Sequence, residues 1–163
     1  MDLTPKRAAE SATEMVQVVL PNDANPLGFI LGGTVMHLID IAGAIACHRH
    51  SRTLLVTAAV DDLQFLHPIK VGDLIILKSR VTCAFTTSLE VQVDVFSEEI
   101  LTGHRQMTSS AFLTFVAIDR SGAKVRVPPL VVESEDDRRV CEAAHRRREL
   151  RLKRKSEVLT TRS

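Results

Sequence analysis

The sequence lacks the features of a nucleic-acid-binding protein or a membrane-spanning protein. Its 163 residues contain no Trp, no Tyr and only six Phe, so a platform for stacking bases would depend on Phe alone. The formal net charge is +1, so no overall field draws the chain to nucleic acid or to an anionic membrane. No apolar run approaches the roughly 20 residues of a membrane span, and the polar opening segment does not resemble a signal peptide. We expect a cytoplasmic protein.

Cysteine is also scarce. Cys47, Cys83 and Cys141 are odd in number, far apart along the chain and without a Cys-x-x-Cys pair. This pattern argues against a disulfide framework and against a cysteine-rich zinc site. His48 and His50 have a spacing that could bind a metal, but two histidines without a third ligand are weak evidence for one. We therefore predict no metal ion and no organic cofactor.

Length and patterning predict one α+β domain, since 163 residues fall within the usual size of a single domain. We expect a mobile arm over residues 1–13, a folded domain over 14–132, and a charged helix and tail over 133–163 that frays near Ser156. A helix over 33–48 is apolar nearly all round, which places it at the centre of the fold. Short turns connect the expected strands, so the sheet is antiparallel and wraps around that helix. The expected strands cover 15–20, 54–60, 73–83, 88–96 and 107–118.

The central helix carries one carboxylate, Asp40. An ionised carboxylate among apolar side chains is costly unless it is paired or hydrogen-bonded, and enzymes often place a general base in such surroundings. By helical spacing Gly33, His37 and Asp40 share one stripe, which could form the wall of a crevice. The alternative is that Asp40 caps a neighbouring backbone group. His37 either orients Asp40 or is an ordinary interface histidine.

A loop with a double glycine precedes this helix. The first amides of a helix have no intrahelical partner, and Gly32-Gly33 would let a ligand approach them closely, which suits a developing oxyanion or a phosphate. The alternative is a tight turn into the helix. Pro26 holds Asn25 out of helical geometry, so the Asn25 amide either orients a water or carbonyl or serves only the turn.

Two further features have both a functional and a structural interpretation. Phe65, near the end of an expected strand, lines either a ligand pocket or the core. Residues 145–155 hold seven basic side chains, Arg148 among them. Such a run is usually a solvated helix face, but it could attract an anionic ligand such as a nucleotide phosphate.

Taken in order, the motifs resemble those of the hotdog-fold acyl-CoA thioesterases of the cytosolic acyl-CoA hydrolase group. No single motif is specific, but the ordered set covers residues 14–151, nearly the whole chain. The matching segments are LPNDANPLG at 20–28, GG at 32–33, IDIAGA at 39–44, VD at 60–61, Phe65, Pro68, VGD at 71–73, TSLEV at 87–91, TFVA at 114–117 and VPPL at 127–130.

The resemblance implies a hotdog fold in which two protomers pair their sheets, and dimers of such relatives commonly associate into hexamers. It implies hydrolysis of an acyl-CoA to a free acid and coenzyme A at the dimer interface. Asp40 would be the general base or nucleophile, Asn25 of the other protomer would position water or substrate, and the Gly33 amide would polarise the thioester carbonyl. The expected substrate-binding residues are Gly32, His37, Phe65, Thr87, Ser88 and Arg148.

The chain departs from the family pattern at Leu31, where an aromatic residue often precedes the double glycine, and at Phe85, where a glycine is common. These departures bear on chain-length preference and on the turn beside the nucleotide. A hotdog enoyl-CoA hydratase is an alternative, but its signature has a histidine where this chain has Gly28. A non-catalytic acyl-CoA sensor or scaffold that could bind nucleic acid through the basic tail is another. We expect neither a nucleic-acid nor a membrane partner.

Overall fold

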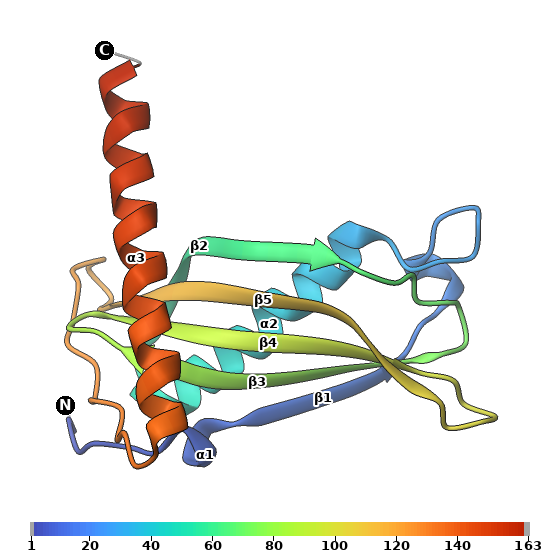
Figure 1. The fold of residues 1–163 in the computed structure, drawn as a ribbon, viewed down its shortest axis with the longest axis horizontal. Helices are drawn as coiled ribbons and strands as arrows, with labels where there is room; N and C mark the ends of the chain where they lie inside the picture. The colour runs from blue at the N-terminus through green and yellow to red at the C-terminus, as the bar shows by residue number, and fades with distance from the viewer. Residues whose placement is uncertain (1, 162–163) are drawn as a thin grey trace.

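The computed structural model describes residues 2–161 and is built on a five-stranded sheet with one long helix on each face. In chain order the elements are α1 (Ala8–Ser11), β1 (Thr13–Val18), the 3-10 helix η1 (Pro21–Asp23), α2 (Gly32–Ser51), β2 (Leu54–Phe65), β3 (Leu74–Ala84), β4 (Ser88–Glu98), β5 (Arg105–Ile118) and α3 (Glu135–Thr161). The sheet order is β1-β3-β4-β5-β2, and every neighbouring pair is antiparallel. In Figure 1, α2 lies behind the sheet, and α3 crosses the front and extends beyond it.

The predicted α+β hotdog architecture is confirmed, with some boundaries moved. The largest change is in β2, which continues to Phe65 rather than ending at Val60. Its pairing with β5 shifts register between Thr57 and Ala59 and again before Gln64. Such bulges interrupt the alternation of buried and exposed side chains, so the sequence pattern ends before the strand does. The C-terminal helix likewise continues beyond Ser156, to the end of α3.

Helix α2 packs closely on the concave face of the sheet because it presents small residues there. Ala42 and Ala46 are fully buried. A Cβ on Gly43 would lie only 3.1 Å from a methyl carbon of Val91 and 3.2 Å from the ring of Phe115, so glycine permits this approach. No helix within residues 2–161, α2 included, is long and apolar enough to cross a membrane.

The segment for which the sequence predicts a mobile arm makes specific contacts with the domain. The backbone N–H of Lys6 donates to the carbonyl of Pro129, and its ammonium group donates to the carbonyl of His50. His50 is fully buried, and its Nε2–H donates to the carbonyl of Pro128 at 2.9 Å. The chain is therefore joined to the domain from Lys6 onward, ahead of the expected start at residue 14.

Helix α3 begins against β3. Ser134 accepts the N–H of Asp137 on its hydroxyl, and the Asp137 carboxylate accepts the N–H of Ser134 in return, a reciprocal cap that fixes the start of the helix. The hydrogen bond with Ser134 is the main cause that lowers the pKa of Asp137. The same carboxylate pairs with Arg80 of β3 at 3.1 Å. The cap between Ser134 and Asp137 and the ion pair with Arg80 thus fix where α3 starts on the sheet.

Farther along α3, an ion pair is buried between the helix and the convex face of the sheet. Glu90 of β4 is only 1% exposed and makes two hydrogen bonds with the guanidinium of Arg147, at 2.7 and 3.0 Å. The hydroxyl of Thr82 also donates to Glu90, and the guanidinium lies 3.6 Å from the ring centre of Phe112. The polar face of β4 is therefore covered by α3 at this point.

The cysteines differ from expectation. Cys83 of β3 and Cys141 of α3 form a disulfide, with Cα atoms 4.9 Å apart and a separation of 58 positions in sequence. The prediction that no disulfide forms was wrong, because the separation in sequence says nothing about where α3 packs. Cys47 is a free thiol in the core, and burial raises its pKa well above the ordinary value.

Candidate active site

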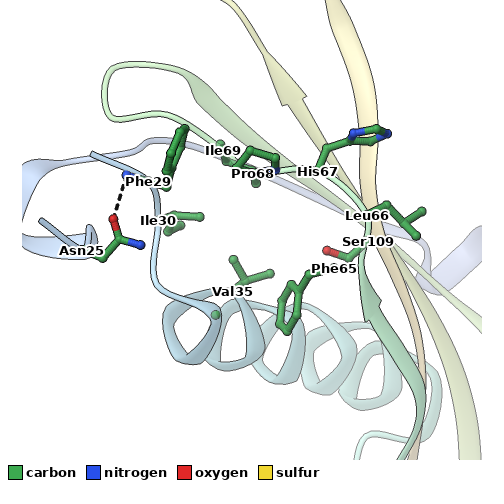
Figure 2. Close-up of a pocket in the computed structure, with 11 residues that line it drawn as sticks. Asn25, Phe29, Ile30, Val35, Phe65, Leu66, His67, Pro68, Ile69 and Ser109 are labelled. Carbon is green, nitrogen blue, oxygen red and sulfur yellow. Dashed lines mark hydrogen bonds between the residues drawn. The ribbon is translucent and has the colours of Figure 1, made fainter. Parts of the chain in front are cut away.

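A pocket of about 340 Å³ opens at the N-terminal end of α2. Figure 2 shows that side chains from several segments of the chain line it. Asn25 lies in the loop after η1, Gly32 and Val35 in the first turn of α2, and Phe65 at the end of β2. The wall is mostly apolar, with the amide of Asn25 and the hydroxyl of Ser109 among its few polar groups. This composition is typical of a small-molecule site.

The surrounding loop fixes the orientation of the Asn25 side chain. Its Oδ1 accepts the backbone N–H groups of Leu27 at 3.0 Å and Phe29 at 3.2 Å. With the oxygen engaged, the Nδ2 group is left to donate, and in Figure 2 it points away from Phe29 toward Ile30. The structural and the functional interpretation of Asn25 are therefore compatible, because the same turn that uses its Oδ1 leaves its Nδ2 available as a hydrogen-bond donor.

The glycines at this end of α2 leave its first amides accessible. The N–H groups of Thr34 and Val35 already donate to the carbonyl of Leu31, whereas those of Gly32 and Gly33 precede the first intrahelical hydrogen bond. A Cβ on Gly33 would meet nothing within 4 Å, and one on Gly32 would only touch the ring of Phe65. A carbonyl oxygen or another anionic group can thus approach this helix end.

Asp40 lies two turns farther along α2. Its Oδ1 accepts a hydrogen bond of 2.6 Å from the hydroxyl of Thr57 on β2. No backbone N–H within residues 2–161 donates to Asp40, so it does not act as a cap. The side chain is partly exposed in the single chain, which corrects the expectation of a buried carboxylate. Its Oδ2 receives no hydrogen bond from residues 2–161.

Sequence reasoning missed Thr57. Threonine is common in strands, and nothing in the run 54–60 distinguishes this one. Thr57 is identified only by the three-dimensional structure, in which it hydrogen-bonds to Asp40 and lies at a register shift of β2. His37, by contrast, is exposed in the single chain, and no hydrogen bond joins it to Asp40.

The other expected substrate-binding residues fall into two places. Phe65 is 52% exposed and lines the pocket, so its functional interpretation is favoured over a core role. Thr87 lies in the β3–β4 turn and Ser88 begins β4, at the opposite end of the sheet from Phe65 (Figure 1). The guanidinium of Arg148 lies 5.1 Å from the ring centre of Phe85 in that same turn. Within one chain, Thr87, Ser88 and Arg148 therefore lie far from the pocket that contains Asn25.

Comparison with known proteins identifies the family. The thioesterase superfamily profile matches residues 27–104. The chain is 41% identical to the uncharacterized acyl-CoA thioester hydrolase YkhA of Bacillus subtilis over 128 residues, which cover 78% of this chain and 74% of that protein. The chain belongs to the thioesterase superfamily. It is also 33% identical to the human cytosolic acyl coenzyme A thioester hydrolase over 83% of its own length, although it spans only 36% of that longer relative.

Solved structures of acyl-CoA hydrolases match this thioesterase-superfamily chain over almost its full length. An acyl-CoA hydrolase from Staphylococcus aureus, in complex with butyryl coenzyme A and coenzyme A, superposes with a TM-score of 0.86 at 33% identity and covers 96% of this chain and 95% of its own. A hexameric acyl-CoA thioesterase gives a TM-score of 0.87 at 39% identity, covering 93% and 97% of the two chains.

The spacing of three polar residues adds detail. Alanine variants of the Staphylococcus aureus hydrolase have been solved at an asparagine, an aspartate 15 residues later and a threonine 17 residues after that. In this superfamily member Asn25, Asp40 and Thr57 have the same order and the same separations. Gly28 takes the position where a hydratase signature has histidine, and its φ of +83° is a conformation that favours glycine.

Proposed function

We propose that this chain hydrolyses acyl-CoA thioesters to a free carboxylic acid and coenzyme A, with Asp40 as the general base. The observation that carries the proposal is the set of Asn25, Asp40 and Thr57, which has the order and spacing of the three residues replaced in the Staphylococcus aureus hydrolase. In this chain the Thr57 hydroxyl donates to one oxygen of Asp40 and leaves the other free. That arrangement suits a carboxylate that accepts a proton from water.

The proposed reaction needs one base and two hydrogen-bond donors. Asp40 removes a proton from a water molecule, whose oxygen attacks the thioester carbonyl carbon. Nδ2 of Asn25 and the N–H of Gly33 donate to the resulting oxyanion. As the carbonyl re-forms, the C–S bond breaks, and the coenzyme A thiolate leaves and takes up a proton. The protein contributes no redox step, and the mechanism uses no metal ion or organic cofactor.

We also propose that two protomers complete each site. In one chain Asn25 lines the pocket at the start of α2, and Asp40 is not among the residues that line it. Exposed apolar side chains of β2, such as Leu54 and Val56, precede Thr57 on the strand and are available to a partner. The hexameric relative indicates an assembly in which such dimers associate further, so we propose a dimer or hexamer.

The remaining substrate contacts are assigned by chemistry. Gly32 and Phe65 line the apolar pocket and would contact the acyl or pantetheine part of the substrate. His37 is exposed near the start of α2 and would become a contact once a partner is present. Thr87 and Ser88 would bind the nucleotide part, with the positive charge of Arg148 opposite its phosphates.

We propose a cytoplasmic location for this activity. The human relative is named as a cytosolic enzyme, and acyl-CoA is a polar, charged substrate of aqueous compartments. Fractionation of the native host, with thioesterase activity recovered in the particulate fraction only, would contradict this location.

Release of free thiol from acyl-CoAs of increasing chain length tests the activity. Asp40→Asn preserves shape and removes the base, so we expect a loss of about 100-fold or more in kcat, in line with the usual contribution of general base catalysis. Asp136→Asn, at an exposed position on α3, is the matched control and should retain wild-type activity. Release that is equal in wild type and Asp40→Asn would show that another group is the base.

Mixing two inactive proteins tests the shared site. Asp40→Ala and Asn25→Ala protomers are mixed under conditions of confirmed subunit exchange. A mixed dimer has one site with both substitutions and one with neither, so activity should recover to about a quarter of wild type in an equal mixture. No recovery despite exchange would place both residues in the same protomer's site.

A further inference from the structure

A cluster of three metal-ligating side chains lies between β3 and α3, apart from the pocket. It consists of Cys83, Cys141 and His145, and their sulfur and ring nitrogen atoms all lie within 4.8 Å of one another. Neither the thioesterase mechanism nor the family comparison uses these residues. Within residues 2–161 it is the one group of at least three such side chains that is placed closely enough to hold a metal ion.

The elements that carry the cluster suit metal binding. Cys141 and His145 are four residues apart on α3, so their side chains lie one turn apart on the same face of the helix. Cys83 approaches from β3, where it is 1% exposed. In a tetrahedral zinc site the bond lengths of about 2.3 Å to sulfur and 2.0–2.1 Å to nitrogen set ligand separations of about 3.5–3.8 Å. The three ligand atoms lie within 4.8 Å of one another, and the two sulfur atoms, which are bonded to each other in the structure, would have to separate on reduction to reach that spacing.

The surroundings hold the histidine without burying it. The ring of Phe85 packs edge-on against the ring of His145, with centres 5.0 Å apart and an interplanar angle of 83°. His145 is exposed and Cys141 partly so, which leaves a path for an ion to enter from solvent. Phe85, one of the two departures from the family pattern, thus serves to orient a ligand of this cluster.

We propose that, with Cys83 and Cys141 reduced, their sulfur atoms and a ring nitrogen of His145 bind one zinc-type cation, with the fourth position open to water. The ion connects α3 to the sheet at the place where the disulfide does so in the structure. Two thiolates and one histidine form a ligand set of the kind zinc prefers. Since the disulfide uses the same two sulfur atoms, metal binding and disulfide formation exclude one another.

Exchange between the two states is balanced when a small-molecule disulfide is the oxidant. One thiolate attacks that disulfide to form a mixed disulfide and release one small thiolate. The second protein thiolate then attacks the mixed disulfide, forms the bond between Cys83 and Cys141, and releases the second small thiolate. Two electrons pass from the protein to the oxidant, and the zinc ion is released unchanged.

Cobalt and zinc titrations of the full chain test the site. The protein is reduced, freed of metal with a chelator and titrated with Co²⁺, whose thiolate complexes absorb in the near ultraviolet; Zn²⁺ then displaces it. We expect one ion per chain. His145→Ala should weaken zinc binding about 100-fold or more, since even substitutions outside the ligand set cost 10–100-fold. Cys141→Ser should weaken binding as well and lower the intensity of the charge-transfer band per bound cobalt ion, because only the Cys83 thiolate remains. His104→Ala, at another exposed histidine, should bind as wild type does.

Oxidation supplies the second arm of the test. After treatment with oxidised glutathione, the thiols titrated in denaturant should fall from three per chain to one, the remaining thiol being that of Cys47, and cobalt binding should be lost in parallel. Failure of the reduced wild type to bind one ion would overturn the proposal, as would wild-type binding by His145→Ala or by the oxidised protein. Circular dichroism checks that each variant is folded. None of these outcomes depends on thioesterase activity.

Discussion

Removal of Arg147 is the sharpest test of how α3 is held on the sheet. Arg147 and Glu90 form a bidentate ion pair in which the Glu90 side chain is 1% exposed and that of Arg147 is 18% exposed. Arg147→Ala deletes both hydrogen bonds to Glu90 and the stacking on Phe112. It leaves a buried carboxylate with the hydroxyl of Thr82 as its remaining side-chain partner.

The expected magnitude follows from the unpaired charge. Breaking a buried ion pair by removing one partner costs about 3–5 kcal/mol. For a chain of this size each kcal/mol corresponds to about 2–4 °C in Tm, so Arg147→Ala should melt roughly 6–20 °C below wild type. Replacing both Glu90 and Arg147 by Met should cost less than the single change, because no charge is left behind. Thr82 then keeps the backbone carbonyl of residue 90 as an acceptor.

Urea unfolding followed by far-ultraviolet circular dichroism measures the effect, since the chain has no Trp or Tyr to report by fluorescence. All variants are compared at one protein concentration, because self-association makes stability concentration-dependent. Arg139→Ala is the matched control. Its pair with Asp136 is exposed, with side chains 77% and 56% accessible, and should contribute at most about 0.5 kcal/mol. A double variant less stable than Arg147→Ala would refute the reasoning.

Three further predictions concern the site and the core. Thr57→Val removes the hydrogen bond to Asp40. Because a hydrogen bond to a charged group contributes about 1.5–3 kcal/mol, kcat for thiol release should fall about 10- to 100-fold. An unchanged kcat would contradict a positioning role for Thr57. Gly43→Ala brings a Cβ to 3.2 Å from Phe115. Overpacking costs about 1–3 kcal/mol, which exceeds the gain in helix propensity of about 1 kcal/mol, so urea unfolding should show a lower free energy of unfolding. A variant more stable than wild type would contradict the contact. Burial lowers the pKa of His50, so the unfolded chain binds more protons below its own pKa of about 6.5. The stability that comes from keeping His50 neutral is complete above pH 6.5 and is lost as the pH falls through the pKa of the folded state. Urea unfolding at several pH values should show this fall in the free energy of unfolding, and His50→Gln should reduce it.

The features that the sequence predicted correctly are those with a local pattern. Helix α2 is apolar on every side, and the inward residues of β4, from Leu89 to Val95, alternate with polar ones, so the type of each element can be read without its neighbours. The end of β2 could not be predicted in this way, because two register shifts break its alternation. Those shifts depend on pairing with β5, which is distant in sequence.

The residues of the candidate site differ in the same way: those with a local sequence signal were predicted, and the one without such a signal was missed. Asn25 and Asp40 stand out locally, one in a proline-directed turn and the other as the lone carboxylate of an apolar helix. Thr57 is distinguished only by its distance from Asp40, which depends on how β2 lies against α2. The expected burial of Asp40 was wrong for one chain because the helix face that carries it is left uncovered at the edge of the sheet.

The docking of α3 could not be predicted from hydrophobicity, because the side of the helix that faces the sheet is itself charged. Ala144 is fully buried there, but three residues later comes Arg147 and four after that Arg151, so the stripe has helical spacing without an apolar pattern. The partners lie on the sheet: Glu90 accepts Arg147 and Asp61 accepts Arg151, each at 2.7 Å. Only part of the basic run is therefore a solvated face. The acidic residues spaced along β2 and β4, rather than any apolar run, were the signal that α3 covers the sheet and brings Cys141 to Cys83.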